Sequence, residues 1–475
     1  MGKITVSRRD FLGQASCAAV GYSTMLSTLL NLKALNSASI SDSSVLGSSD
    51  YKALVCISLG GGNDSFNMLV PRGNDAYNAY SNTRSELAIS KSSLLPIQDL
   101  SNNIELGLHP SLSKVQALFN EGEAAFIANV GTLVEPATRE DFWSEKKRFP
   151  LGLLSHSDQL QQWQTAVPND RLGEGWGGRI ADMINDVNPN QNISMNISLD
   201  GNNIFQTGRK TVEYSVGHAG SDNAGAKEIR YYADGEPIFR FRREAIDNML
   251  DRHYNNIFQR TYNDVVRSAR DGFLEFNNAV RDITFDTSFQ DDNWNFSRSM
   301  EMVAKTIAAK DSLGFKRQTF YIGFNGWDHH DEVIISQQNM LAALDQGIDS
   351  FQKALDEINA KDCVVTFLIS DFARTLTSNG NGTDHAWGGN VMAVGGPVKG
   401  QNVYGLYPET LSIAGDSQED IGGGILIPTT SADMYFAELA EWFGVSRSNL
   451  GDIFPNLGNF YDYMVEDNPL SFLHK

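Results

Sequence analysis

The sequence predicts an α/β protein with a doubly wound, mainly parallel sheet and helices on both faces. Short, continuous apolar runs recur along the chain, and strands buried on both faces of a parallel sheet have this composition. Segments with helical periodicity separate the runs, and alternation of strands with helices favours parallel pairing. The chain of 475 residues is long enough to bury a large core.

The apolar runs and the periodic segments place the elements in order. The predicted strands cover residues 53–59, 124–130, 319–324, 363–369 and 391–394. The predicted helices include residues 111–120, 242–259, 261–280 and 336–358. Residues 186–300 are rich in Asn, Asp, Arg and aromatic residues. We expect either an insertion or cap there, or extra helices packed on the sheet.

Residues 1–38 have the composition of a twin-arginine signal peptide. The motif Ser7-Arg8-Arg9-Asp10-Phe11-Leu12 follows a short charged start and precedes a mildly apolar run, which is the order of regions in such signals. The run contains Gly, Ser, Thr and Gln and is too polar to span a bilayer. We therefore expect export by the twin-arginine translocase to the periplasm or beyond, a flexible spacer at 39–50 and a single domain at 51–465.

Charge and cysteine content narrow the class of protein. The formal net charge of −20 at pH 7 argues against nucleic-acid binding. No later run is long and apolar enough to span a membrane, so an integral membrane protein is not expected. Cys17 lies in the predicted signal, whereas Cys56 and Cys363 lie in apolar runs. We expect buried free thiols there. The alternative, in an oxidising compartment, is a disulfide between them, for which neighbouring strands must align these side chains.

Candidate metal ligands stand at the ends of the predicted strands, where an open parallel sheet binds its ligands. Asp64, the group Asp328-His329-His330 and Asp371 each follow a strand, and the pair Asp384-His385 precedes the last strand. The histidines of most interest are His156, His329, His330 and His385. Divalent ions such as zinc take imidazole and carboxylate ligands together. Each residue alone also fits a hydrogen-bonded turn, but the recurrence at successive strand ends indicates a metal site.

Other polar residues near these ends each have two interpretations. Ser155 and His156 start a predicted helix, where they form a simple N-cap or help to bind an anion. Arg374 either binds a carboxylate structurally or clamps an anionic group. Of the adjacent His329 and His330, we expect one to be a ligand and the other a wall residue. The chain lacks a Gly-x-Ser-x-Gly motif and a P-loop, which disfavours serine hydrolases and nucleotide binding.

The twin-arginine signal and five motifs closely resemble the bacterial family called domain of unknown function 1501. The motifs are Leu59-Gly60-Gly61-Gly62-Asn63-Asp64, Gly326-Trp327-Asp328-His329-His330, Ser370-Asp371-Phe372-Ala373-Arg374-Thr375, Gly382-Thr383-Asp384-His385-Ala386-Trp387-Gly388-Gly389 and Ile427-Pro428-Thr429-Thr430. The resemblance spans nearly all of residues 50–460. That family looks like a distant branch of the alkaline phosphatase and sulfatase superfamily, which implies a doubly wound sheet with two metals at the strand ends.

The resemblance implies a role for each candidate ligand. Asp64 corresponds to the acidic ligand after the first strand. Asp328 and His330 correspond to the Asp/His pair of one metal. Asp371 corresponds to the acidic member of an Asp-His dipeptide, and His385 to a late histidine before a Gly-containing turn. One or two divalent ions are implied, with zinc as the expected metal.

Two positions depart from the superfamily's pattern. Phe372 stands where the superfamily has a histidine directly after the second-site Asp, so one metal site lacks a ligand. His156 stands at the position of the Ser/Thr/Cys nucleophile, beside Ser155. Ser155 after a one-residue shift, His156 itself or a water could then attack the substrate. Alternatively, the protein binds a ligand without turning it over.

These observations lead to three hypotheses about function. The first is a periplasmic metal-dependent hydrolase of phosphate or sulfate esters, acting on a small anionic ester, with Arg374 steadying the reacting group. The second is a non-catalytic exported binding or assembly protein that kept the fold. The third is a serine hydrolase of carboxyl esters, which depends only on Ser155 and its neighbours.

Overall fold

The computed structural model describes residues 50–100, 104–221, 224–226, 237–252 and 254–474. The twin-arginine signal predicted at 1–38 and nearly all of the spacer predicted at 39–50 lie outside these residues. From Asp50 onward the chain forms one compact unit. Across the described ranges, no helix is both long enough and apolar enough to cross a membrane.

A ten-stranded sheet dominates the described part of the chain, in the order β12-β5-β11-β10-β1-β9-β6-β7-β8, with β13 beside β5. The central strands β10, β1, β9, β6 and β7 are parallel, whereas β11 and β8 are antiparallel to their neighbours. The predicted mainly parallel α/β fold is therefore confirmed. The strands are β1 (Lys52–Gly60), β5 (Ala124–Gly131), β6 (Asn196–Ser198), β7 (Tyr214–Gly217), β8 (Gly225–Ala226), β9 (Arg317–Asn325), β10 (Val364–Ser370), β11 (Gly389–Val394), β12 (Val403–Gly405) and β13 (Thr430–Ser431).

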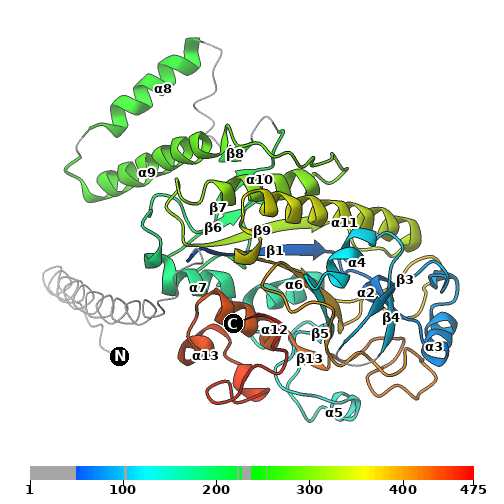
Figure 1. Cartoon of the computed structure of the whole chain (residues 1–475). Helices are drawn as coiled ribbons and strands as arrows, with labels where there is room; N and C mark the ends of the chain where they lie inside the picture. Colours follow the sequence, from blue (N-terminus) through cyan, green and yellow to red (C-terminus); the bar gives the residue numbers. More distant parts are fainter. Residues whose placement is uncertain (1–49, 101–103, 222–223, 227–236, 253, 475) are drawn as a thin grey trace, which may run out of the picture. The chain divides into compact units, whose positions relative to one another are not determined.

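Helices pack on both faces of this sheet. In Figure 1, α10 and α11 lie on one side of β1, and α6, α7 and α12 lie on the other. The helices are α2 (Ser65–Met68), α3 (Asn74–Arg84), α4 (Ser113–Asn120), α5 (Arg139–Ser144), α6 (His156–Thr165), α7 (Trp176–Ile184), α8 (Pro237–Leu250), α9 (Ile257–Val280), α10 (Phe296–Ala308), α11 (Val333–Glu357), α12 (Ala432–Phe443) and α13 (Leu450–Ile453). Short 3-10 turns occur at Ser85–Leu87, Asn185–Val187, Lys361–Cys363, Arg447–Asn449 and Leu457–Asn459.

All five predicted strands are present, as β1, β5, β9, β10 and β11. The remaining strands of the main sheet are two to four residues long, which is too short for a recognisable apolar run. A second, three-stranded antiparallel sheet was not predicted for the same reason. It consists of β2 (Leu69–Pro71), β4 (Glu105–Leu108) and β3 (Leu95–Gln98).

The prediction of one helix at 242–259 is wrong. Helix α8 ends at Leu250, and α9 begins at Ile257. The Asn256 side chain accepts hydrogen bonds from the backbone N–H groups of Phe258 and Gln259, so it caps a new helix. Apolar periodicity continues across this break, and periodicity alone therefore did not reveal it.

The segment 186–300 both extends the sheet and adds helices. Strand β6 pairs with β9, for example through Ile197 and Phe320, and β7 and β8 continue the sheet beyond it. Helix α9 packs against β8, and α10 packs against α11 and β9. Elements packed on the sheet are thus present, and a capping role over a substrate stays a prediction.

Cys56 and Cys363 are both free thiols, and Cys56 is buried as expected. Cys363 is only half-buried, because it ends the 3-10 turn before β10 rather than lying within the strand. Cys56 in β1 lies beside Phe367 in β10, four residues along from Cys363. Val364, the first residue of β10, lies three residues from Phe367, which is roughly 10 Å along the strand at about 3.3 Å per residue, and Cys363 precedes it. A disulfide needs Cα atoms closer than about 7 Å.

The register of the central strands brings three loops to one edge of the sheet. Leu59 of β1 pairs with Ser370 of β10, and Gly60 of β1 pairs with Asn325 of β9. The loops that follow β1, β9 and β10 therefore leave the sheet side by side. These are the loops in which the sequence places most of the candidate ligands.

Candidate metal centre

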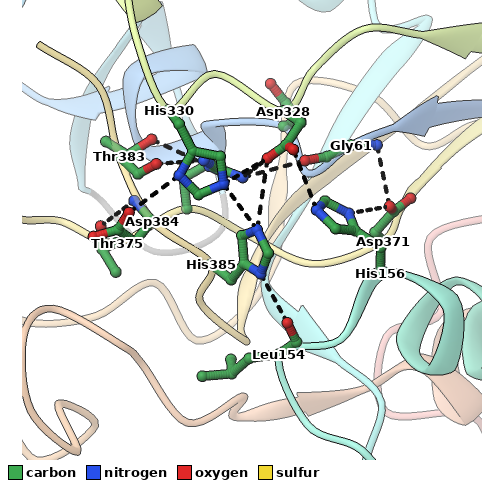
Figure 2. A network of polar contacts seen from close by, with 12 residues as sticks. Gly61, Leu154, His156, Asp328, His330, Asp371, Thr375, Thr383, Asp384 and His385 are labelled. Atoms are coloured by element: carbon green, nitrogen blue, oxygen red, sulfur yellow. Dashed lines mark hydrogen bonds and ion pairs between the residues drawn. The ribbon is translucent and has the colours of Figure 1, made fainter. Parts of the chain in front are cut away.

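Most of the predicted ligands converge at this edge of the sheet. Asp328 and His330 lie in the loop after β9, and Asp371 directly follows β10. His385 lies before β11, and His156 is the first residue of α6. Figure 2 shows that the three imidazoles face the carboxylate of Asp328. Residues from four distant parts of the chain thus form one cluster.

Glycines shape the two loops that carry the cluster. Gly61 has a φ of 116°, and its N–H donates to Asp371 Oδ2 at 3.1 Å. Gly326 has a φ of 112°, and its N–H donates to the carbonyl of Gly60 at 3.1 Å. Such positive φ values are unfavourable for residues with a Cβ atom. The glycines therefore let the loops after β1 and β9 turn tightly against each other.

The ligand atoms are spaced as the ligands of one metal ion would be. Asp328 Oδ1 lies 3.0 Å from His330 Nε2 and 3.6 Å from His385 Nε2. The two Nε2 atoms lie 3.0 Å apart. In a tetrahedral zinc site with bonds near 2.0–2.1 Å, ligand atoms are about 3.3 Å apart. The Asp328, His330 and His385 atoms thus fit around a single ion.

His156 completes the cluster from the opposite side of Asp328. Its Nε2 lies 3.4 Å from Asp328 Oδ2. Ligand atoms of His156, Asp328 and His385 all lie within 4.8 Å of one another. His156 is therefore placed either as a further ligand or as a base beside an ion.

The second nitrogen of each imidazole has its own acceptor. His156 Nδ1 lies 2.8 Å from Asp371 Oδ2, His330 Nδ1 lies 3.1 Å from Asp384 Oδ1, and His385 Nδ1 lies 2.8 Å from the carbonyl oxygen of Leu154. A carbonyl and an ionised carboxylate only accept hydrogen bonds. A proton on Nδ1 of each neutral ring satisfies these acceptors and leaves the Nε2 lone pair facing the centre, which is the tautomer that a cation beside Asp328 selects.

With the protons on Nδ1, the space between His330, His385 and Asp328 suits a cation. Two neutral rings with Nε2 lone pairs 3.0 Å apart, beside the carboxylate of Asp328, repel one another unless a proton or a cation lies between them. Metal-bound histidines commonly donate the other N–H to a carboxylate or a carbonyl, which fixes the ring. The donor set fits a divalent ion that accepts nitrogen and oxygen ligands.

Burial and neighbouring charges shift the pKa values of Asp328, Asp371 and His385. Burial alone raises the pKa of Asp328, but the hydrogen bond and charge of Arg374 bring it below its usual value, so this carboxylate is ionised at neutral pH. Burial lowers the pKa of His385, which favours the neutral ring. Burial also raises the pKa of Asp371, although the hydrogen bond to His156 opposes this effect. Ionised Asp328 and neutral His385 are the forms that bind metal.

Arg374 is fully buried and its guanidinium is engaged by the protein. Nη1 donates to Asp328 Oδ1 at 2.7 Å and to the carbonyl of Gly61 at 3.3 Å. Nε donates to Thr383 Oγ1 at 3.2 Å, and Nη2 donates to the carbonyl of Thr383. Of its two predicted roles, this geometry favours the structural one, in which Arg374 orients Asp328.

Asp64 does not join the cluster. It is 1% exposed and forms an ion pair with the fully buried Arg84. Arg84 also donates to Asn67 Oδ1 and to the carbonyl of Thr375. The charge of Asp64 is therefore balanced within the protein, by a residue that sequence reasoning did not single out.

Two further predictions concern neighbours of the ligands. His330 faces the cluster, whereas His329 is buried and packs on Trp327 with ring centroids 6.1 Å apart. The Ser155 hydroxyl lies 3.3 Å from that of Ser157 and hydrogen-bonds to Asp158. Neither partner of Ser155 is an imidazole that could act as its base.

Phe372 and Asp384 complete the surroundings of the centre. The Phe372 ring contacts the rings of His156 and His385, with centroids 4.7 and 4.5 Å away. It thus forms an apolar wall of the centre. Asp384 orients His330 and was missed as a functional residue, although its position beside His385 in an Asp-His pair could have indicated it.

Comparisons with known proteins identify a family and two weakly similar structures. The family described as "Protein of unknown function (DUF1501)" matches residues 51–445. No curated protein matches the chain. Ps i-CgsB in complex with k-i-k-neocarrahexaose has 10% identity and a TM-score of 0.34, over 86% of this chain and 76% of that one. The PsFucS1 sulfatase from Pseudoalteromonas sp. has 9% identity and a TM-score of 0.34, over 90% of this chain and 74% of that one.

The family match includes all of the residues that form the centre, from Gly61 to His385. It also confirms the resemblance found in the sequence motifs. Because the match covers residues 51–445, which is most of the chain, this protein belongs to the DUF1501 family of proteins of unknown function.

Proposed function

We propose that this protein is a hydrolase of phosphate or sulfate esters that uses one divalent ion, with zinc as the expected metal. The observation that supports the proposal most directly is the orientation of His330 and His385. Both rings direct Nε2 at Asp328 Oδ1, and both are held at Nδ1 by a separate acceptor. When bound, such an ion supplies Lewis-acid polarisation of the ester oxygen.

The centre is proposed to hold one ion rather than two. Asp64, the first-strand carboxylate, already has Arg84 as its counter-ion. Phe372 places an apolar ring beside Asp371, at a position where a second ion would need a ligand. The remaining donors are Asp328, His330 and His385, which suffice for a catalytic site with an open position.

His156 is proposed to act as the base. Asp371 holds its Nδ1 at 2.8 Å, so the neutral ring presents Nε2 toward the centre. In the reaction, water transfers a proton to His156 Nε2 as its oxygen bonds to phosphorus or sulfur. The bond to the ester oxygen breaks, and the leaving oxygen keeps the electron pair and takes up a proton. An Asp–His pair in this orientation is a common source of general-base catalysis.

Metal analysis of variants tests the ligand set. Protein purified without chelators should contain about one equivalent of metal, because three donors converge on one point. Asp328→Ala and His385→Ala should lose the ion, whereas His218→Ala, which changes a histidine outside the cluster, should retain it. Full metal content in Asp328→Ala would refute the ligand assignment.

Kinetics of His156→Ala separate a base from a ligand. This variant should keep the ion but lose hydrolysis of p-nitrophenyl phosphate or p-nitrophenyl sulfate by about 100-fold or more, the usual effect of removing a general base. Loss of the ion instead would show that His156 is a ligand. Turnover by the unchanged protein should disappear with EDTA.

A non-catalytic binding protein is the second candidate, and Phe372 is the observation that favours it. The ring removes a polar position from the centre and packs on two of its imidazoles. This candidate predicts metal binding without turnover of either ester. The third hypothesis, a serine hydrolase of carboxyl esters, predicts that a fluorophosphonate probe labels Ser155.

Export by the twin-arginine route is proposed from Arg8 and Arg9. Changing both to lysine should leave the full chain in the cytoplasm, because the translocase recognises the arginine pair. Cell fractionation and immunoblotting would measure the distribution. Unchanged amounts in the periplasm would refute this route.

A further inference from the structure

A cavity of about 890 Å³ is lined in part by the loop that follows β9, the loop that also carries Asp328 and His330. The start of α4, the loop before α10 and the first half of α11 line it, together with Gly326 and His329. Its volume falls within the range of about 300–1,000 Å³ that is usual for small-molecule sites. We propose that this cavity binds a neutral, polyhydroxylated ligand such as a saccharide.

Unsatisfied polar atoms in the lining indicate a ligand. Ser297 is 1% exposed, and its hydroxyl has no hydrogen-bond partner among the described residues. His329 is also buried, and its Nδ1 is likewise unpartnered within the described ranges. Both side chains line the cavity. Buried polar groups are normally hydrogen-bonded, so these two atoms are available to a bound molecule.

The charged groups in the lining are already compensated, which favours a neutral ligand. Asp345 accepts the backbone N–H groups of Lys114 and Val115 at the start of α4, at 3.0 and 2.8 Å. Asp292 accepts the N–H of Ser297 at 2.7 Å and that of Trp294 at 2.8 Å, near the start of α10. Each carboxylate thus offsets the positive end of a helix.

The two other charged side chains of the lining also have partners within the protein. Asp291 accepts from Arg298 Nε at 2.6 Å. The Lys114 ammonium donates to Gln346 Oε1. No large excess of either charge is therefore left to select an anion or a cation.

The remaining groups match the surface of a sugar ring. Trp294 and Met340 provide an apolar surface beside Gly326. A Cβ atom at Gly326 would lie 3.4 Å from Met340 Cε and 3.9 Å from Trp294 Nε1, so the absence of a side chain keeps this surface open. Asn339, Ser336 and Gln290 provide neutral hydrogen-bonding groups around it. A saccharide has an apolar face and a rim of hydroxyl groups, and aromatic rings with polar neighbours suit this combination.

The ligand would contact the same loop that carries the metal ligands. His329 lies between Asp328 and His330 in the sequence, and its carbonyl accepts the N–H of Thr383 at 3.1 Å. The cavity and the centre thus share a loop without sharing a polar group. Saccharide binding does not depend on the proposed hydrolysis, so the two proposals can fail separately.

Saturation-transfer NMR and tryptophan fluorescence with full-length protein test the proposal. The probes are the neutral disaccharides lactose, cellobiose and maltose, with spermidine and glucose 6-phosphate as charged comparators. At least one neutral probe should bind saturably. Trp294→Ala should weaken this binding by about tenfold or more, equivalent to about 1.4 kcal/mol.

Two variants control for folding. Ser297→Ala removes a hydroxyl that makes no hydrogen bond in the protein, so it should weaken binding without loss of stability. Trp143→Ala changes a 65% exposed tryptophan in α5 outside the cavity and should leave binding unchanged. The proposal is overturned if no neutral disaccharide binds, if only a charged probe binds, or if binding is the same in Trp294→Ala and Ser297→Ala as in the unchanged protein.

Discussion

Histidines in this protein differ in function according to the partner of each ring nitrogen. In His330 and His385, Nδ1 faces an acceptor and Nε2 faces the centre, so the neutral rings can bind a cation. His109 is the opposite case. Its Nδ1 accepts the backbone N–H of Ser111 at 3.1 Å, and the side chain is buried. A buried imidazole that accepts a backbone hydrogen bond has a structural role.

His109 should make stability depend on pH. Burial lowers its pKa from 6.5 to about 4. The unfolded chain takes up this proton first, so the stability that neutral His109 contributes is present above pH 6.5 and is lost as the pH falls toward 4. The loss amounts to roughly 3 kcal/mol at most. Urea unfolding of the unchanged protein and of His109→Gln between pH 7 and 4.5 would measure it.

The difference between the unfolding free energies of these two proteins isolates His109, because every other residue is the same in both. His109→Gln should be less stable at pH 7 and should approach the stability of the unchanged protein at pH 4.5. Parallel pH profiles for the two proteins would contradict the expected effect.

At the scale of elements, the loop after β1 contacts three of the segments that form the centre and holds them in position. Gly61 donates to Asp371, Arg374 donates to the carbonyl of Gly61, and the loop after β9 packs directly on Gly61. A Cβ atom at Gly61 would lie 2.4 Å from the backbone nitrogen of Asp328. Two loops that come from neighbouring strands therefore define one another's shape.

Gly61→Ala should disturb the centre more than it disturbs the fold. The new methyl group must displace the Asp328 backbone, and the positive φ adds strain of about 1–3 kcal/mol. We expect loss of most bound metal, measured by elemental analysis of protein that retains its circular dichroism spectrum. Gly173→Ala is the matched control, because a Cβ atom there meets nothing within 4 Å. Equal metal content in both variants would refute this view of the loop.

At the scale of the whole molecule, an aromatic cluster joins the sheet to the helices on one face. Trp176 of α7 stacks on Phe436 of α12 at 4.8 Å and contacts Phe205 at 4.7 Å. Phe367 of β10 and Phe454 lie 5.7 and 5.9 Å from the same ring. This cluster lies in the body of the fold rather than at the strand ends that carry the centre.

Trp176→Ala should lower the free energy of unfolding by about 3–5 kcal/mol, the usual range for truncating a buried tryptophan. Metal bound per folded molecule should not change, since no ligand contacts Trp176. Thermal unfolding together with metal analysis of the folded fraction would test both statements. Trp143→Ala serves as the control, with a change near zero expected at this exposed position. A loss of metal from folded Trp176→Ala would show that core and centre are coupled.

Whether a strand or helix could be predicted from the sequence depended on its length and on how deeply it is buried. Strands β1, β5, β9, β10 and β11 are continuous apolar runs, so they could be located before the structure was known. The edge strands are too short to show a pattern. The break between α8 and α9 depends on one Asn256 cap within a periodic segment, and a cap of this kind is a local hydrogen bond that apolar spacing does not record.

The sequence by itself determined the mainly parallel α/β class, the family and a set of acidic and imidazole side chains at strand ends. Only the tertiary structure decided which of them meet. Asp328, His330 and His385 converge, whereas Asp64 pairs with Arg84. These pairings join residues far apart in the chain through the register of β1, β9 and β10, and register depends on packing of the whole sheet rather than on any local pattern.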